Sequence, residues 1–426
     1  MNPLKTIRQI GSLEQVCAAA GEGLAPAGPP VFNTHIHLPP NFSAFESVRQ
    51  AVDLAAAQNV GVLGAGNYYD FTVYQEFASA AEAKGIFPLF STEIIALDED
   101  LCGKGIRVND PGNPGKIYLC GKGISRFADP SPQGLQLLNT IRRNDALRMR
   151  QMIEKMCDCF RRVGLEMNLD DTVVIERIVR RHQCRRETVT LQERHAAQAF
   201  QEVFFEKVPA RRRAAKLTEL FGTDPKSRPE DAVGIQNEIR SYLMKAGKSC
   251  FVEETFLSPA QAEQLIGQLG GIACYPVLAD GASPICEYEA PAERLIEWLR
   301  QKQYTMVEFI PLRNTPQTLT EYVRAIRAAG ILVTAGTEHN TLDLLPLEPA
   351  CRQGVSIPED LKDLFWEGTC VLAAHQFLSA HDQCGFVDSA GRPNPEYKDA
   401  QSRIEAFRNI GRAVIEMYFQ KHRNQG

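Results

Sequence analysis

Two histidines, His35 and His37, stand two positions apart at the end of the apolar run VFNTHIHLPP. On a β-strand, residues i and i+2 point to the same face, so both imidazoles would leave the sheet side by side. Neighbouring imidazoles are frequent metal ligands, although an H-x-H pair is also a common hydrogen-bonded structural pair. The pattern predicts a metal-binding edge and leaves the structural alternative open.

Further ligands of the kind that metals prefer follow other expected strands. Glu93 lies in FSTEI after the third strand, and Glu338 and His339 lie in TAGTEHN after the last one. In barrel folds the functional side chains collect where strands end. Two imidazoles and two carboxylates form a mixed nitrogen and oxygen site suited to zinc, manganese or iron, and an open position on the ion would activate a water as nucleophile. We therefore expect His35, His37, Glu93 and Glu338 to bind a divalent metal ion.

The segments that must position these residues alternate β-rich runs with helical patterns. About seven such units favour an α/β fold of the closed or distorted barrel type over an open doubly wound sheet. The sequence has no G-x-G-x-x-G motif and no P-loop, which makes a nucleotide-binding sheet the weaker alternative. Besides a first strand at Val31, buried strands are expected over 59–66, 85–94, 115–123, 270–280, 304–313 and 330–339.

The middle of the chain differs from the rest in charge. Residues 139–250 hold 23 Lys and Arg against 16 Asp and Glu, which gives them a net charge of +7. Since the whole chain has a net charge of −5, the rest of the chain carries −12. Long stretches of this region have helical periodicity, and its basic clusters are expected to be a solvated face rather than a polyanion site. The predicted organisation is an N-terminal helix and linker over 1–30, a barrel over 31–138 and 251–345, a basic helical insertion over 139–250, and a C-terminal helical extension over 346–426.

Composition narrows the class of protein. The 426 residues are 44% hydrophobic, enough to bury a large core, and no apolar run approaches the roughly 18 residues that a membrane helix needs. The N-terminus MNPLKTIRQIGSLEQV lacks the apolar core of a signal peptide. Twelve cysteines at irregular spacing, without a C-x-x-C pair, are typical of free thiols in a reducing compartment. We expect a cytoplasmic protein without a membrane partner.

Taken in order, these motifs resemble those of the polymerase and histidinol phosphatase (PHP) superfamily of metal-dependent phosphoesterases. The likeness covers about residues 30–345 and rests on the H-x-H pair, a Glu in GIFPLFSTE, an insertion carrying ERHAAQAF, then QLGGIACYPVLAD and AAGILVTAGTEHN. It implies a distorted seven-stranded barrel, a (β/α)7 PHP-like fold, with metal ions at the strand ends. It also implies a metal site formed by His35, His37, Glu93 and Glu338, with Glu338 where the family usually has Asp.

The sequence departs from the family pattern at other ligand positions. Tyr68 and Tyr69 in GNYYD stand where the family has the Asp and His of T-D-H, and Tyr118 stands at the histidine of the fourth strand. The expected A-H-P reads ACYPVLAD. The resemblance therefore implies that the second and third metal sites are lost and that one ion is bound per chain. A single ion clamps a phosphoryl group less well than two ions do.

Several further residues are candidates for roles at this site. His339 is expected to act as general base, Tyr69 to donate a hydrogen bond to a substrate oxygen, and Arg313 to clamp a carboxylate or phosphate. A turn-rich loop carrying Lys116 and Lys122 is a candidate for substrate binding, with a purely structural loop as the competing interpretation. The remaining candidates are His195 as the insertion histidine, Asp280 as a ligand or base, Glu308 as the partner of an arginine, and His375 as a satisfied core histidine.

The predicted function is that of a metal-dependent hydrolase of the PHP type with a single-metal site. It would act on a phosphorylated or carboxylated small molecule through a metal-activated water. Three alternatives remain open at this point: a mononuclear isomerase or lyase for a sugar acid, a barrel that binds a ligand without turnover, and a true PHP phosphoesterase. The last would need residues such as His195, Asp280 and His339 to complete further metal sites. The expected partner is a small anionic substrate, and nucleic acid is not favoured. The C-terminal helices are expected to cover the barrel or to form the face of a homo-oligomer.

Overall fold

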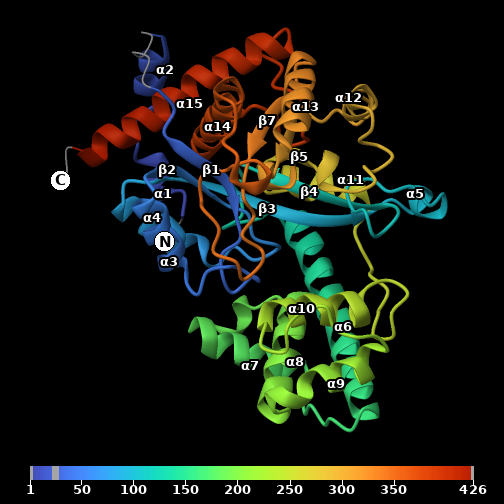
Figure 1. The fold of residues 1–426 in the computed structure, drawn as a ribbon. Helices are drawn as coiled ribbons and strands as arrows, with labels where there is room; N and C mark the ends of the chain where they lie inside the picture. The colour runs from blue at the N-terminus through green and yellow to red at the C-terminus, as the bar shows by residue number, and fades with distance from the viewer. Residues whose placement is uncertain (1–2, 22–27, 424–426) are drawn as a thin grey trace.

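The computed structural model describes residues 3–21 and 28–423, and its centre is a seven-stranded sheet (Figure 1). Neighbours in the sheet follow the order of the sequence from β1 to β7. The strands are almost wholly buried, as expected for runs of apolar residues without alternation. The strands are β1 (Val31–Ile36), β2 (Val60–Ala65), β3 (Phe87–Leu97), β4 (Lys116–Lys122), β5 (Ile272–Val277), β6 (Met306–Phe309) and β7 (Leu332–Ala335).

One strand breaks the parallel arrangement. β4 is antiparallel to both β3 and β5, whereas the other neighbouring pairs are parallel. Only the short helix α5 (Glu99–Gly103) and turns join β3 to β4, and no crossover helix packs across the sheet between these two strands. The uniform βαβ rhythm expected from the sequence is therefore wrong at this strand.

The two ends of the sheet meet, which makes it a nearly closed barrel. Backbone hydrogen bonds join the end of β1 to the segment after β7: the N–H of His37 donates to Glu338 O at 2.7 Å, and the N–H of Glu338 donates to His35 O at 2.9 Å. The expected distorted (β/α)7 barrel is thus confirmed, and the closure places the residues after β1 and β7 side by side.

Helices with one apolar face pack around the sheet and complete the main core. Several begin with a side-chain cap, as where Ser47 accepts from the N–H of Gln50 and Thr315 from the N–H of Thr318. The helices around the barrel are α3 (Val48–Ala57), α4 (Tyr74–Ala83), α11 (Pro259–Gln268), α12 (Ala292–Gln301) and α13 (Pro316–Ala328).

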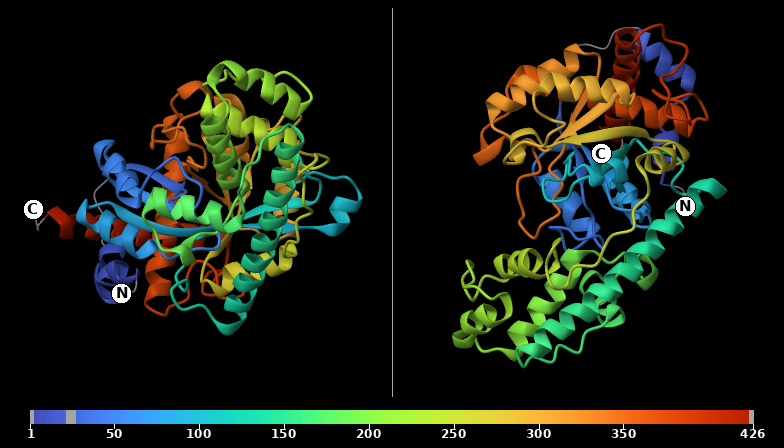
Figure 2. Two further views of the ribbon diagram at one scale, coloured as in Figure 1. Left: turned by 90° about the horizontal axis from the view of Figure 1, so that it is seen from below. Right: turned by 90° about the vertical axis from the view of Figure 1, so that its right-hand side faces the viewer.

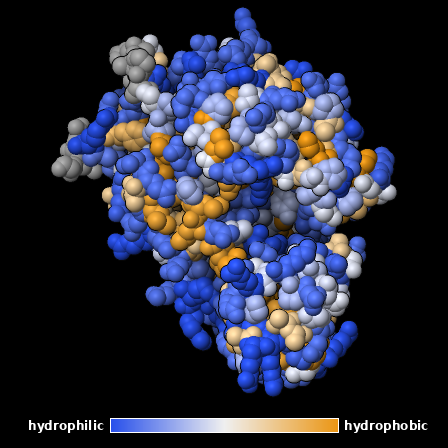
Figure 3. Space-filling view, viewed as in Figure 1, coloured by the Kyte–Doolittle hydropathy of each residue, from blue (hydrophilic) through white to orange (hydrophobic). Residues whose placement is uncertain are grey.

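The insertion between β4 and β5 is a helical unit that lies against the strand-end face of the barrel (Figures 1 and 2). It has a hydrophobic core of its own, formed by residues between 149 and 252. The expected boundary at residue 139 falls inside the long helix α6, which runs from the barrel along the whole insertion. The insertion contains α6 (Pro132–Arg162), α7 (Asp171–His182), α8 (Glu193–Lys207), α9 (Ala210–Phe221), α10 (Ala232–Ile239) and the π-helix η2 (Arg240–Met244). In the space-filling view the surface is hollowed where the two parts meet (Figure 3).

The C-terminal helices α14 (Glu359–Ala380) and α15 (Ala400–Arg423) cover the side of the barrel away from the insertion (Figure 1). A Cβ atom on Gly411 of α15 would collide with Cys370 O of α14, so glycine is needed for this close helix crossing. The N-terminal helices α1 (Lys5–Arg8) and α2 (Leu13–Gly21) pack nearby, and residues 22–27 of the expected linker lie outside the described residues. None of the described helices is long and apolar enough to span a bilayer.

Candidate metal centre and its adjoining cavity

Three of the predicted metal ligands converge at the mouth of the barrel. Glu93 Oε2 lies 3.1 Å from His37 Nε2 and 3.8 Å from His35 Nε2, and all three side chains are buried. His35 Nε2 has no hydrogen-bond partner among the described residues. Because a buried nitrogen without a partner is costly, its position facing a carboxylate is suited to a cation bound between the two groups. The three side chains form a group able to hold a metal ion.

Strand register explains why these residues meet. His35 belongs to β1 and His37 follows it, and Glu93 lies in the middle of β3, which continues to Leu97 where it pairs with β4. The expectation that Glu93 follows its strand is therefore wrong by several residues. Tyr68, which follows β2, donates to Glu93 Oε1 at 2.9 Å and stacks on the His37 ring at 5.1 Å.

The electrostatic surroundings keep Glu93 ionised. Burial alone would raise the pKa of Glu93, but the hydrogen bond from His37 and the charges of His37 and His35 outweigh it and lower that pKa. A carboxylate that stays ionised when buried is the form a metal ion requires.

A second carboxylate holds His35 from behind. Glu308 Oε2 lies 2.8 Å from His35 Nδ1, and Glu308 Oε1 accepts hydrogen bonds from Lys122 Nζ and, at 3.2 Å, from Thr34 Oγ1. The Glu308 carboxylate favours the tautomer of His35 in which Nδ1 carries the proton. In that tautomer Nε2 has the lone pair and faces Glu93. Burial opposes ionisation of Glu308, but Lys122 and His35 lower its pKa to about 2.

This arrangement corrects two expectations. Glu308 pairs with a lysine and a histidine, not with an arginine. Lys122 is on β4 in the barrel interior and fully buried, so it does not stand on a substrate-binding loop. Its ammonium group also neutralises Glu308 within the group formed by His35, Cys120 and Glu308, which could otherwise hold an ion.

Two glycines give the His35 ring its place. A Cβ atom on Gly66 would collide with Cδ2 of the His35 ring, and one on Gly336 would lie 2.5 Å from its Cβ. Any side chain at either position would have to move the imidazole, so both glycines shape the ligand's position.

Glu338 lies beside this centre but outside the three-residue group. Its Oε2 is bonded to Arg313 Nη2 at 2.5 Å and to Asn340 Nδ2 at 2.7 Å. Burial alone would lower the pKa of Arg313, but Glu338 outweighs it and the pKa is raised. The structure thus brings the two residues together as an ion pair at the barrel mouth. The guanidinium of Arg313 already has a carboxylate partner within the protein.

The His339 ring is turned away from the centre. Its Nδ1 is 2.7 Å from Thr337 Oγ1, its Nε2 is 3.0 Å from Leu345 O, and its ring stacks on Phe45 at 5.0 Å. Because both ring nitrogens are engaged, neither can take a proton from substrate in this geometry. This arrangement does not support His339 as general base, and that role stays a prediction.

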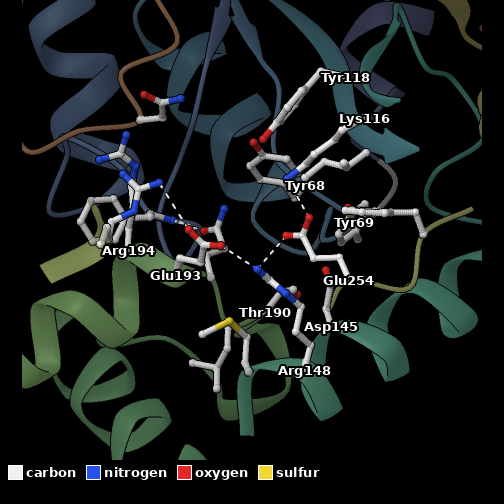
Figure 4. Close-up of a pocket in the computed structure, with 18 of the residues that line it drawn as sticks. Tyr68, Tyr69, Lys116, Tyr118, Asp145, Arg148, Thr190, Glu193, Arg194 and Glu254 are labelled. Atoms are coloured by element: carbon white, nitrogen blue, oxygen red, sulfur yellow. Dashed lines mark hydrogen bonds and ion pairs between the residues drawn. The ribbon is translucent and has the colours of Figure 1, made fainter. Parts of the chain in front are cut away.

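A cavity of about 120 Å³ opens between the metal centre and the insertion (Figure 4). Tyr68, Tyr69, Tyr118 and Lys116 line it from the barrel, so the predicted residues Tyr69 and Lys116 lie together with the tyrosine that holds Glu93. Lys116 Nζ is bonded to Glu254 at 2.8 Å. Burial raises the pKa of Tyr69 well above its ordinary value and that of Tyr118 to about 12, so both are neutral hydroxyl donors at neutral pH.

Other predicted residues lie apart from the centre. His195 is buried on α8 and its Nδ1 accepts from the N–H of Gln192, so it serves the helix start and does not line the cavity. Asp280 accepts from Asn314 and Thr315 as a local cap. His375 is buried with hydrogen bonds to Gly270 O and from the Phe386 N–H, which confirms it as a satisfied core histidine.

Sequence reasoning missed the charged residues that the insertion contributes to the cavity. They come from three separate segments, and the only available signal was the excess of positive charge over 139–250. In ERHAAQAF the predicted site residue was His195, but the residues that line the cavity are the two before it, Glu193 and Arg194. The charged cavity residues of the insertion are Asp145 and Arg148 on α6, Glu193 and Arg194 on α8, Arg240 on η2, and Lys245.

The comparisons with known proteins show a similarity of fold. No family model matches the chain, and no curated protein matches it in sequence. A crystal structure from Bifidobacterium adolescentis, of a protein assigned by inference as a metal-dependent phosphoesterase, is similar over 78% of this chain and 94% of its own, with 14% identity and a TM-score of 0.52. An amidohydrolase from Chromobacterium violaceum, solved with bound sulfate and no metal, is similar over 76% and 93%, with 17% identity and a TM-score of 0.49.

The likeness to the Bifidobacterium adolescentis structure agrees, at the level of fold, with the resemblance that the motifs indicate. Identities below one fifth leave reaction and substrate open. The chain shares an overall fold with that structure, and in this chain the fold is a distorted, seven-stranded α/β barrel.

Proposed function

We propose that this protein is a metal-dependent hydrolase with a single-metal site that acts on a phosphorylated or carboxylated small molecule. The observation that carries the proposal is the convergence of His35 Nε2, His37 Nε2 and Glu93 Oε2 beside a cavity rich in cationic side chains. Two imidazoles and one carboxylate are a ligand set of hydrolytic zinc enzymes, which leave a position open on the ion.

Two cationic side chains support a single ion. Lys122 is bonded to Glu308, and Arg313 is bonded to Glu338. In each case a carboxylate next to the centre already has a positive partner, so neither needs a second metal ion for charge balance. The described structure therefore favours one ion held by three side chains.

The chain's own residues prepare the site for hydrolysis. A divalent ion held there would act as a Lewis acid and make a hydroxide nucleophile available near neutral pH. Tyr68 fixes the orientation of Glu93 by its hydrogen bond to Oε1, which leaves Oε2 facing the histidines. Tyr69 and Tyr118 offer neutral hydroxyl groups to a substrate oxygen in the cavity. The anionic substrate is drawn in by the positive side chains of the insertion.

The test is hydrolysis of a panel of phosphate monoesters, lactones and amides by protein treated with chelator and then reloaded with Zn²⁺, Mn²⁺ or Fe²⁺. His37→Ala is compared with His381→Ala, whose ring bonds to Phe377 O at the end of α14. We expect turnover of at least one anionic class that requires metal, survives His381→Ala and is lost in His37→Ala. Turnover that persists in chelator or in His37→Ala would refute the proposal, as would the absence of metal-dependent turnover across the panel.

A further inference from the structure

Four cationic side chains of the insertion gather around one carboxylate at the start of α8 (Figure 4). Glu193 Oε1 is 2.6 Å from Arg148 Nη2, and Glu193 Oε2 is 2.7 Å from Lys245 Nζ and 3.6 Å from Arg240 Nη2. Arg194 follows Glu193 on the same helix and lines the same cavity. We call Arg148, Arg194, Arg240 and Lys245 the basic cluster.

The basic cluster has more positive charge than its neighbours neutralise. Besides Glu193, the one carboxylate of the described residues within ion-pair distance of the cluster is that of Glu254, at 2.8 Å from Arg148, and Glu254 is shared with Lys116. Asp145 also lines the cavity. Across the part of the chain that the structure describes, Arg194 has no carboxylate within ion-pair distance, and its nearest polar contact is Asn237 Oδ1 at 3.5 Å.

Two observations indicate that the basic cluster has an unused hydrogen-bond donor and an uncompensated charge. Arg240 Nε is buried and has no hydrogen-bond partner among the described residues. Burial and the neighbouring Arg240 lower the pKa of Arg194 to about 10, as expected for a guanidinium whose charge is not compensated. A buried donor without a partner costs free energy unless a ligand supplies the acceptor.

The cavity joins the basic cluster to the metal centre. Its opposite wall includes Tyr68, the residue whose hydroxyl group holds Glu93. A ligand bound by Arg194 therefore lies in the same cavity as a ligand that reaches the metal centre past Tyr68. The aromatic side chains of Phe42 and Phe256 also line this cavity.

We propose that the basic cluster binds a phosphate group of the substrate that is not the group attacked at the metal centre. This deepens the proposed function and rests on it. N–H donors reach the cavity from α6, α8 and η2, and donors from several directions suit the three free oxygens of a phosphate monoester better than the two coplanar oxygens of a carboxylate. The substrate class is a small organic phosphate whose reactive bond lies on the side opposite that phosphate.

The test is calorimetric titration of the full-length protein with inorganic phosphate, and separately with acetate, at constant ionic strength. The variants are Arg194→Gln, Arg194→Lys, Arg240→Gln and His37→Ala, with Arg211→Gln, an exposed arginine on α9, as matched control. We expect phosphate to bind more tightly than acetate, and we expect Arg194→Gln and Arg240→Gln each to raise Kd for phosphate by about tenfold or more, the effect of losing a charge-assisted hydrogen bond. Arg194→Lys should restore part of the affinity, and Arg211→Gln should leave it unchanged.

The variant His37→Ala separates this inference from the proposed function. Phosphate bound by the basic cluster keeps its affinity in His37→Ala, even if the barrel holds no metal and performs no hydrolysis. Phosphate that binds only through the metal centre loses affinity in His37→Ala and keeps it in Arg194→Gln and Arg240→Gln, and that result would overturn the inference. Absence of measurable phosphate binding, or acetate binding as tight as phosphate binding, would overturn it too.

Discussion

His35 Nδ1 lies 2.8 Å from Glu308 Oε2 in the closed interior of the barrel, and this contact leaves the other ring nitrogen facing Glu93. Partners of this kind set the tautomer and orientation of a metal-binding histidine. Glu308 thus acts on the metal centre through His35, as a positioning residue.

The first prediction concerns metal affinity. Glu308→Gln removes the charge that favours a proton on Nδ1 of His35, so the metal Kd should rise by about 10- to 100-fold. The measurement is competition with a chelator of known affinity. Glu405→Gln, on the exposed face of α15, is the matched control and should keep the wild-type Kd. An unchanged Kd in Glu308→Gln would show that the contact does not tune the ligand.

The second prediction separates stability from positioning. Lys122→Met leaves Glu308 buried without its cation and should lower the free energy of unfolding by about 3–5 kcal/mol. The double variant Lys122→Met/Glu308→Gln has no lone buried charge, so it should recover much of that loss in denaturant unfolding. It should not recover metal affinity. Equal losses of stability in the single and double variants would contradict the ion-pair account.

The existence and order of the strands were predictable from sequence, and so was the His35 and His37 pair, because runs of buried residues are a local property. The partnership of Glu308 with Lys122 was not predictable in the same way. It depends on β4 running antiparallel, with the Lys122 side chain buried in the barrel, where it reaches Glu308 of β6. The segment KIYLCGK alone does not determine the direction of this strand.

The cavity was also beyond sequence reasoning, for a different physical reason. Its basic residues come from α6, α8 and η2, and only tertiary packing of the insertion brings them opposite Tyr68. Similarly, the turn of the His339 side chain toward Thr337 and Leu345 O reflects the backbone of one loop, in which Glu338 and His339 both have positive φ.

The third prediction tests the space that the His35 ring needs. Gly66→Ala places a methyl group against the imidazole, so the ring must shift and the protein should bind metal at least about tenfold more weakly. Gly103→Ala on α5 is the control, because no atom lies within 4 Å of its added Cβ. Metal content and chelator competition are measured for both. Equal metal binding in the two variants would show that the ring position is not critical.

The fourth prediction is a pH dependence of anion binding. Burial raises the pKa of Asp145 to about 7, against the opposing effect of Arg148, and Glu254 and Lys116 are the other charged groups that act on it. Protonated Asp145 is neutral, so the cavity is more positive below that pKa and less positive above it. Affinity for an anion should therefore fall as the pH rises through about 7.

Sulfate is the probe for this test, because its own charge stays constant over the range. We expect Kd for sulfate to rise about two- to fivefold between pH 6 and pH 8 in the wild type. Asp145→Asn should show a flat profile at the tighter value. No histidine of the described chain lines the cavity. A slope that survives Asp145→Asn would assign the titration to another group.

The most direct test of the central claim is metal content per chain, measured by elemental mass spectrometry on protein purified without chelator. Glu93→Gln and His37→Ala are measured alongside the wild type and Glu405→Gln. The account predicts about one divalent ion per chain in the wild type and in Glu405→Gln, and far less in the two ligand variants. A wild type without metal, or ligand variants that retain the wild-type amount, would contradict it.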